Sequence, residues 1–127
     1  MELDYTKTTG NKFDDVVAGI EKSTSAKGFR VLYIHDVQAT LSEKGFKREP
    51  LKIVEICNAK FAHEALSINE SVSLFMPCKI NVYTKGGKTV ISAARPKIIS
   101  EFFSDPRLKK LADEVDGVVR SIVDDAC

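Results

Sequence analysis

The sequence predicts a single α+β domain in which helices pack on a mainly antiparallel sheet. Segments with strand alternation and segments with helical periodicity are mixed along the 127 residues. One tight hairpin is clear, and the other connections lack the regular length of βαβ units, so we favour this class over a doubly wound parallel sheet. A composition of 43% hydrophobic and 29% charged residues is that of one ordinary globular domain. We therefore treat residues 1–127 as one unit.

Four elements are predicted in the first part of the chain. Residues 3–8 are β-rich and are expected to form an edge strand, and residues 28–37 alternate in the manner of a second strand. Between them, residues 11–27 are expected to form an amphipathic helix, and residues 39–45 to form a short helix of about two turns. The first helix carries its apolar residues at helical spacing: Phe13, Val16, Val17, Ile20 and Thr24.

The middle of the chain places a helix directly after a central strand. Residues 51–57, LKIVEIC, are β-branched and apolar and predict a strand. Asn58 follows it and is a favourable helix cap for residues 59–69. Residues 71–77 are apolar and are expected to run extended towards the next strand.

The last part of the chain predicts a hairpin and a long helix. Strands over 78–84 and 89–94 are separated by Lys-Gly-Gly-Lys, in which adjacent glycines supply the positive φ angles of a tight turn. A Ser-Asp-Pro sequence then starts a helix over 105–124. Its apolar residues form one broad stripe: Leu108, Leu111, Ala112, Val115, Val118, Val119, Ile122 and Val123.

Charge and cysteine usage limit the classes of partner. A net charge of +1 and a pI near 7.7 are well below the basic balance of a nucleic-acid binder. No apolar run approaches membrane-spanning length, and no secretory signal is visible at the amino terminus, although a chain whose signal had been removed would look the same. Three cysteines, Cys57, Cys78 and Cys127, leave one unpaired in any disulfide scheme. We expect a reducing, cytoplasmic location, with neither nucleic acid nor membrane as partner.

Two of these cysteines are the leading candidates for chemistry. Cys57 closes a strand just before a helix, where backbone N–H groups stabilise a thiolate. The helix outward and the extended segment back have matched lengths, so Cys78 is expected at the same end of the sheet. The simpler interpretation, which we favour, is that both are small buried hydrophobic residues at strand ends.

A polar cleft is the other candidate. Glu55 lies inside an apolar strand, and it meets Lys79 or Asn81 if the two strands are neighbours. A solvated sheet face is the simpler interpretation, and a ligand cleft is the alternative. The separations from Cys57 to Cys78 and from His35 to Cys57 show no ligand spacing, and His63 is expected on the solvent side of its helix, so we predict neither a metal nor a cofactor.

Several of these segments together resemble a known family. They are KGF (27–29), EICNA (55–59), Ala65-Leu66 and MPCKINVY (76–83). Over about residues 10–97 the chain resembles the bacterial and archaeal family catalogued as domain of unknown function 302, although Ala59 stands where that family often has proline. The resemblance implies a compact α+β domain with one copy of a TATA-binding-protein-like fold, and homodimers. It draws attention to Cys57, Asn58, Pro77 and Cys78.

Two classes of function remain open. Common hydrolase, kinase and dinucleotide motifs are absent from the sequence. We therefore favour a non-catalytic homodimer with a small-ligand cleft near the Cys-Asn and Pro-Cys strand ends. Its ligand-binding residues would be Glu55, Cys57, Asn58, Cys78 and Asn81. The alternative is a thiol-dependent redox or sulfur-handling protein, with Cys57 as nucleophile and Cys78 as resolving thiol.

One apolar segment favours self-association. Within residues 71–77, the apolar side chains have no obvious partner among the predicted helices and strands. They are Val72, Leu74, Phe75 and Met76.

Overall fold

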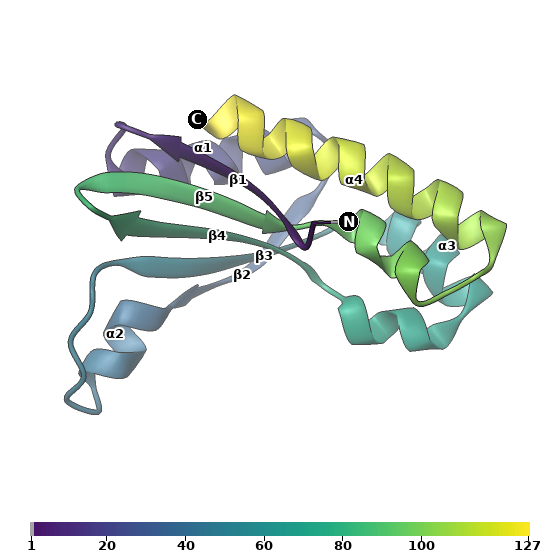
Figure 1. Ribbon diagram of the computed structural model, residues 1–127, viewed down its shortest axis with the longest axis horizontal. Helices are drawn as coiled ribbons and strands as arrows, with labels where there is room; N and C mark the ends of the chain where they lie inside the picture. Colours follow the sequence, from purple (N-terminus) through teal and green to yellow (C-terminus); the bar gives the residue numbers. More distant parts are fainter. Residues whose placement is uncertain (1) are drawn as a thin grey trace.

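A computed structural model describes residues 2–127 and shows a five-stranded sheet with helices packed against it (Figure 1). The strands are β1 (Asp4–Thr9), β2 (Arg30–Asp36), β3 (Leu51–Cys57), β4 (Cys78–Lys85) and β5 (Lys88–Ala94). The α-helices are α1 (Phe13–Ala26), α2 (Val37–Ser42), α3 (Ala59–Ile68) and α4 (Pro106–Ala126). Two short 3₁₀ helices, η1 (Glu70–Phe75) and η2 (Pro96–Glu101), complete the order.

Every strand pair in the described sheet is antiparallel, in the order β1-β5-β4-β3-β2. The tight turn between β4 and β5 forms as expected, because Gly86 and Gly87 adopt φ angles of 58° and 77°. The predicted α+β class with an antiparallel sheet is confirmed.

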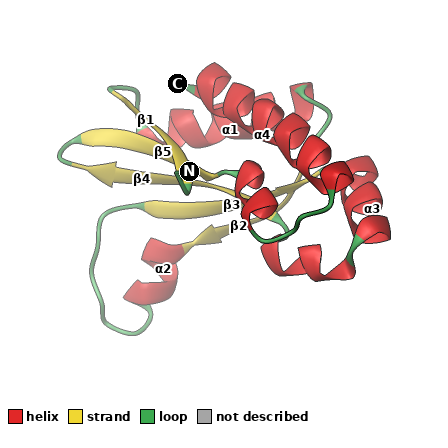
Figure 2. Ribbon diagram, turned by 45° about the vertical axis from the view of Figure 1, so that its right-hand side comes forward, coloured by secondary structure: helices red, strands yellow, loops and turns green. Residues whose placement is uncertain are grey.

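Helices α1 and α4 cover one face of the sheet (Figures 1 and 2). Their apolar stripes pack against the inward-facing residues of β3, β4 and β5, which alternate along each strand. The opposite face carries half-buried and exposed polar side chains. The fully buried core residues on the sheet are Val54, Ile56, Ile80, Val82, Ile91 and Ala93.

The structure corrects the expectation of an extended segment at 71–77. Residues of this segment belong to η1, because the side chain of Asn69 accepts a hydrogen bond from the Ser71 N–H at 2.9 Å and starts a helical turn. The turn rotates Val72 into the interior, where it is 2% exposed, while Leu74 stays 83% exposed. Local side-chain capping therefore prevails over the strand-like composition of the segment.

Two further elements differ from the expectation. Helix α2 begins at Val37 rather than at residue 39, because Asp36 accepts a hydrogen bond from the Ala39 N–H at 3.0 Å. Residues 96–101, for which the pattern predicts no element, form η2.

Within residues 2–127, no helix has both the length and the apolar character that crossing a bilayer requires.

Candidate functional site

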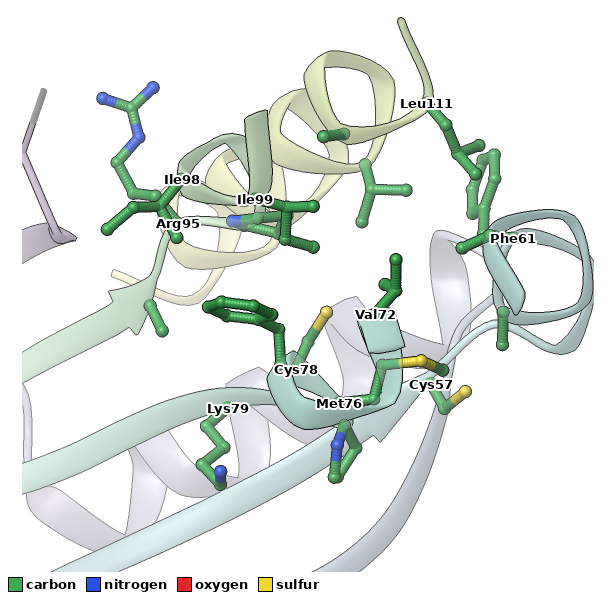
Figure 3. Close-up of a pocket in the computed structure, with 18 of the residues that line it drawn as sticks. Cys57, Phe61, Val72, Met76, Cys78, Lys79, Arg95, Ile98, Ile99 and Leu111 are labelled. Atoms are coloured by element: carbon green, nitrogen blue, oxygen red, sulfur yellow. The ribbon is translucent and has the colours of Figure 1, made fainter. Parts of the chain in front are cut away.

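A largely apolar pocket lies at the end of the sheet where β3 finishes and β4 begins (Figure 3). Its volume is about 430 Å³. Helices α3 and α4 and both 3₁₀ helices contribute side chains to its walls. The apolar groups include Phe61, Val72, Phe75, Ile98, Ile99 and Leu111.

Asn58 turns the chain from β3 into the α3 wall of this pocket. Its Oδ1 accepts a hydrogen bond from the Phe61 N–H at 3.1 Å, which confirms the predicted cap. Its Nδ2 donates to the Gly28 carbonyl at 3.0 Å, which ties the start of α3 to the segment before β2. Both the oxygen and the nitrogen of the Asn58 side-chain amide therefore make hydrogen bonds that position the α3 wall of the pocket.

The two cysteines lie at the same end of the sheet, as expected. Cys78 pairs with Ile56 across the β3–β4 ladder, so Cys57 is one residue further along. Successive side chains of a strand point to opposite faces, and Cys57 therefore points away from the side that Ile56 and Cys78 share. Figure 3 shows the Cys78 sulfur directed into the pocket and Cys57 at its margin; both thiols are free.

Burial controls the chemistry of Cys78. Removal from water, with a smaller contribution from the neighbouring Cys57, raises the pKa of its thiol to about 11, and the positive charge of Lys79 offsets only part of this effect. At neutral pH the Cys78 side chain is a neutral thiol, which behaves as a small, weakly polar part of an apolar wall.

Glu55 and Asn81 lie elsewhere, on the face of the sheet opposite α1 and α4. Glu55 pairs in register with Lys79, as expected for neighbouring strands. Its carboxylate, however, contacts His35, whose Nε2 lies 3.3 Å from the Glu55 Oε1. The His35 ring stacks on Tyr33 with centroids 4.5 Å apart.

Asn81 sits in the middle of the same face, between Ile53 and Ser92. Within the described chain its Oδ1 is buried and has no hydrogen-bond partner. The five expected ligand-binding residues thus form two groups: Cys57, Asn58 and Cys78 line the pocket, whereas Glu55 and Asn81 do not.

Sequence reasoning missed the part of the pocket that comes from η2. Ile98 and Ile99 line the cavity from the side opposite α3 (Figure 3), and Phe102, just after the helix, is also a lining residue. The available signal was the apolar run after Pro96, which no predicted element explains. Phe102 reaches Phe75 of η1, with ring centroids 5.4 Å apart.

No group of three or more His, Cys, Asp or Glu side chains within residues 2–127 has the arrangement of a metal site. The pocket is therefore described by its apolar walls and by the few polar groups at its edge.

Comparison with known proteins places the chain in a family. The sequence model for the domain of unknown function DUF302 matches residues 5–126. The chain belongs to the DUF302 family. This result confirms the resemblance inferred from the Cys-Asn and Pro-Cys segments.

A solved DUF302 structure has the same fold. The crystal structure of an uncharacterized conserved DUF302 protein from Bacillus stearothermophilus is 30% identical in sequence and covers 100% of both chains, with a TM-score of 0.94. No curated protein matches the chain. DUF302 membership therefore establishes the architecture, while a role has to be argued from the site.

Proposed function

We propose that this DUF302 chain is a non-catalytic binding domain for a small apolar molecule, held in the pocket between α3, α4 and the two 3₁₀ helices. The observation that carries the proposal is a cavity of about 430 Å³ with mainly aliphatic and aromatic walls. Pockets of about 300–1,000 Å³ are the usual size for small-molecule sites. Four of its lining side chains, Leu3, Leu74, Phe75 and Phe102, are also exposed large hydrophobic residues.

The polar groups around the cavity support a neutral, apolar ligand. Both polar atoms of the Asn58 side chain are already hydrogen-bonded, and the raised pKa of Cys78 keeps its thiol neutral. Arg95 and Lys79 also line the cavity, but Figure 3 shows their charged ends directed away from its centre. Ligand affinity would come from burial of apolar surface, at about 25 cal/mol per Å².

The side chains that line the pocket also support binding rather than acid–base catalysis. The described residues that line the pocket include no carboxylate and no imidazole. General acid–base catalysis needs such groups within hydrogen-bond reach of the substrate.

The thiol-dependent alternative has less support. A resolving thiol attacks as its thiolate, and a pKa of about 11 leaves Cys78 with very little thiolate at neutral pH. Strand alternation also directs Cys57 and Cys78 to opposite faces.

Self-association and a cytoplasmic location remain part of the proposal. In the apolar segment 71–77, Val72 is buried within the chain, and Leu74 and Phe75 are the large hydrophobic residues that remain exposed. A second copy that covers these side chains would remove them from water. Three free thiols are consistent with a reducing cytoplasm.

Binding is tested by titrating the protein with N-phenyl-1-naphthylamine, a neutral apolar dye whose fluorescence rises in apolar surroundings. We expect a saturable increase for the wild-type chain. Ala62→Trp, which places a large side chain in the pocket lining of α3, should abolish it. Ala18→Trp on the exposed face of α1 is the matched control and should bind the dye normally.

The two tryptophan variants also separate pocket binding from adsorption to the exposed apolar side chains. Both variants keep Leu74 and Phe102, so adsorption would give the same signal in each. Equal dye binding by Ala62→Trp and Ala18→Trp, or no saturable binding by the wild-type chain, would overturn the proposal.

A further inference from the structure

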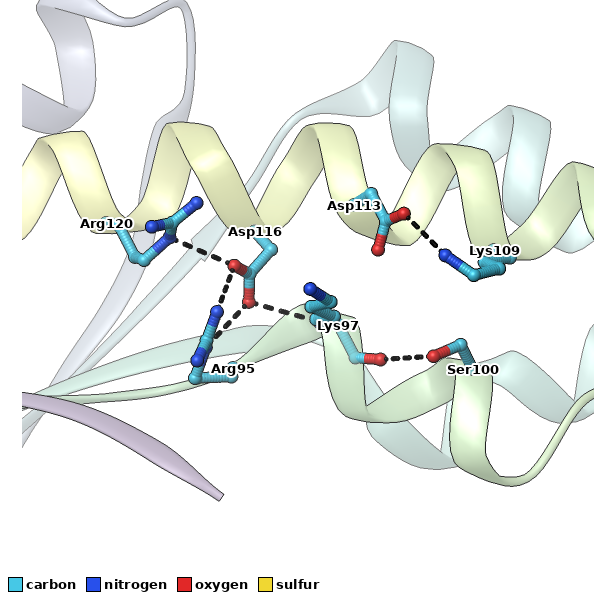
Figure 4. Close-up of polar contacts among 7 residues, drawn as sticks. All are labelled: Arg95, Lys97, Ser100, Lys109, Asp113, Asp116 and Arg120. Atoms are coloured by element: carbon cyan, nitrogen blue, oxygen red, sulfur yellow. Dashed lines mark hydrogen bonds and ion pairs between the residues drawn. The ribbon is translucent and has the colours of Figure 1, made fainter. Parts of the chain in front are cut away.

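A buried carboxylate lies behind one wall of the pocket. Asp116, in the middle of α4, is 1% exposed. Arg95 donates to both of its oxygens, from Nε at 3.1 Å and from a terminal nitrogen at 2.8 Å. The Lys97 backbone N–H donates at 3.3 Å and the Arg120 Nε at 3.1 Å (Figure 4).

These contacts join the end of β5, the start of η2 and the middle of α4. Arg95 follows the last residue of β5, Lys97 lies in the first turn of η2, and Arg120 lies one turn beyond Asp116 on α4. Asp116 thus fastens the start of η2 to α4. The same short helix presents Ile98 and Ile99 to the pocket.

The carboxylate remains charged despite its burial. Burial alone raises the pKa of Asp116, but the hydrogen bonds from Arg95 and the Lys97 N–H and the charges of Arg95 and Arg120 outweigh it, so the pKa is below its ordinary value. Each hydrogen bond to this carboxylate is therefore charge-assisted and directional.

The position of η2 depends on such an anchor. A six-residue 3₁₀ helix has poorer hydrogen-bond geometry than an α-helix and does not hold its own orientation well. At its far end, Phe102 is 66% exposed, and the aromatic contacts of Phe102 and Phe103 with Phe75 join that end to η1 rather than to α4. The directional bonds to Asp116 fix the start of η2 against α4, in addition to the packing between the two helices.

We propose that Asp116 is a positioning residue for the ligand pocket, which acts by holding η2 against α4 so that Ile98 and Ile99 form the wall. This inference rests on the proposed binding function. Asp116 does not line the pocket. It raises ligand affinity by increasing the fraction of molecules in which the wall is assembled.

The test compares Asp116→Asn with Asp113→Asn. Asp113 lies on the same helix, is half-buried and pairs with Lys109 at 2.9 Å, and within residues 2–127 no hydrogen bond or ion pair joins either side chain to η2 (Figure 4). Both variants are first checked by urea unfolding, and all measurements are made where each is fully folded. Hydrogen exchange over residues 96–103 then reports the η2 wall, and dye titration reports the pocket.

We expect Asp116→Asn to increase exchange at 96–103 more than in the β3–β4 ladder. The dissociation constant of the dye should rise about tenfold, because the apparent constant is inversely proportional to the fraction of molecules with an assembled wall, and we expect that fraction to fall to about a tenth. Asp113→Asn should change neither quantity by more than about twofold. Asp116→Glu, which keeps the charge, should recover part of the protection and of the affinity.

The outcomes separate this inference from the proposed function. If the wild-type chain binds no dye, the proposed function fails, while exchange at 96–103 still reports whether Asp116 holds η2. If the wild-type chain and Asp116→Asn bind equally well, the inference is wrong and the binding function stands. A uniform rise in exchange across the whole sheet would show a general structural role and would also overturn it.

Discussion

Cys78 lies directly opposite Ile56 in the β3–β4 ladder and therefore shares its face of the sheet, whereas Cys57, the next residue of β3, points the other way. The two thiols meet different surroundings although they lie at the same sheet end. Cys78 belongs to the apolar wall, and its pKa of about 11 reflects that burial first. Its reactivity is therefore a direct measure of the pocket environment.

The Cys78 thiol should react slowly with iodoacetamide in the folded protein. A rise in pKa from 9.0 to about 11 lowers the thiolate fraction at pH 7.5 about hundredfold. The measurement uses the Cys57→Ala, Cys127→Ala double variant, in which Cys78 is the single thiol, in buffer and in urea. A native rate within about threefold of the unfolded rate would contradict the buried-wall assignment.

The same pKa shift makes stability depend on alkaline pH. The thiol pKa is raised in the folded state, so its stabilising contribution is complete below pH 9 and is lost as the pH rises through about 11. At pH 10.5 the wild-type chain should lose about 2 kcal/mol relative to Cys78→Ala, compared with their difference at pH 8. Urea unfolding at the two pH values measures this change, and a constant difference would refute the shift.

Asn58 is expected to stabilise the fold through two separate hydrogen bonds. Asn58→Ala removes the cap of α3 and the bond to the Gly28 carbonyl, and it should cost about 2 kcal/mol of unfolding free energy. Asn58→Asp keeps the capping oxygen and loses the donor, so it should cost about half as much. Equal losses in chemical denaturation would show that the cap contributes little.

Val72 and Leu74 should differ sharply in their contribution to stability, although they are two residues apart in η1. Val72 is 2% exposed and Leu74 is 83% exposed. Val72→Ala should lower the unfolding free energy by about 2 kcal/mol through lost burial and packing. Leu74→Ala should change it by less than about 0.5 kcal/mol. Similar losses for the two variants in thermal unfolding would contradict the burial of Val72 by the turn of η1.

Leu74 is instead expected to matter for self-association. If a second copy covers the exposed residues of η1, Leu74→Glu should shift the chain towards the monomer, because the charge would be desolvated in the interface. Leu32→Glu is the matched control, since Leu32 is also an exposed leucine, at 51%, but lies on β2. Sedimentation velocity at micromolar concentration distinguishes the outcomes. A wild-type particle of 14.0 kDa would exclude the dimer under these conditions.

Local signals in the sequence were sufficient for most elements. Strand β3 has the predicted bounds, Asn58 caps α3 as expected, and α4 begins within the predicted Ser-Asp-Pro sequence, with Asp105 as its cap. These features depend on residues within one helical turn or one strand, where side-chain periodicity and capping act directly. The expectation at 71–77 was wrong because the Asn69 side chain caps a helical turn there, and this local signal prevails over the strand-like apolar composition.

The composition of the site was decided by contacts between distant segments. Strand alternation already places Glu55 and Asn81 on the face opposite Ile56 and Cys78, but which face the helices cover is set by the packing of α1 and α4. The wall formed by η2 depends on Arg95 meeting Asp116, 21 residues away along the chain. Sequence patterns therefore determined the elements and brought Cys57, Asn58 and Cys78 to one end of the sheet. Tertiary packing alone closed an apolar pocket there, because burial depends on which surfaces meet in space rather than on which residues are neighbours in the chain.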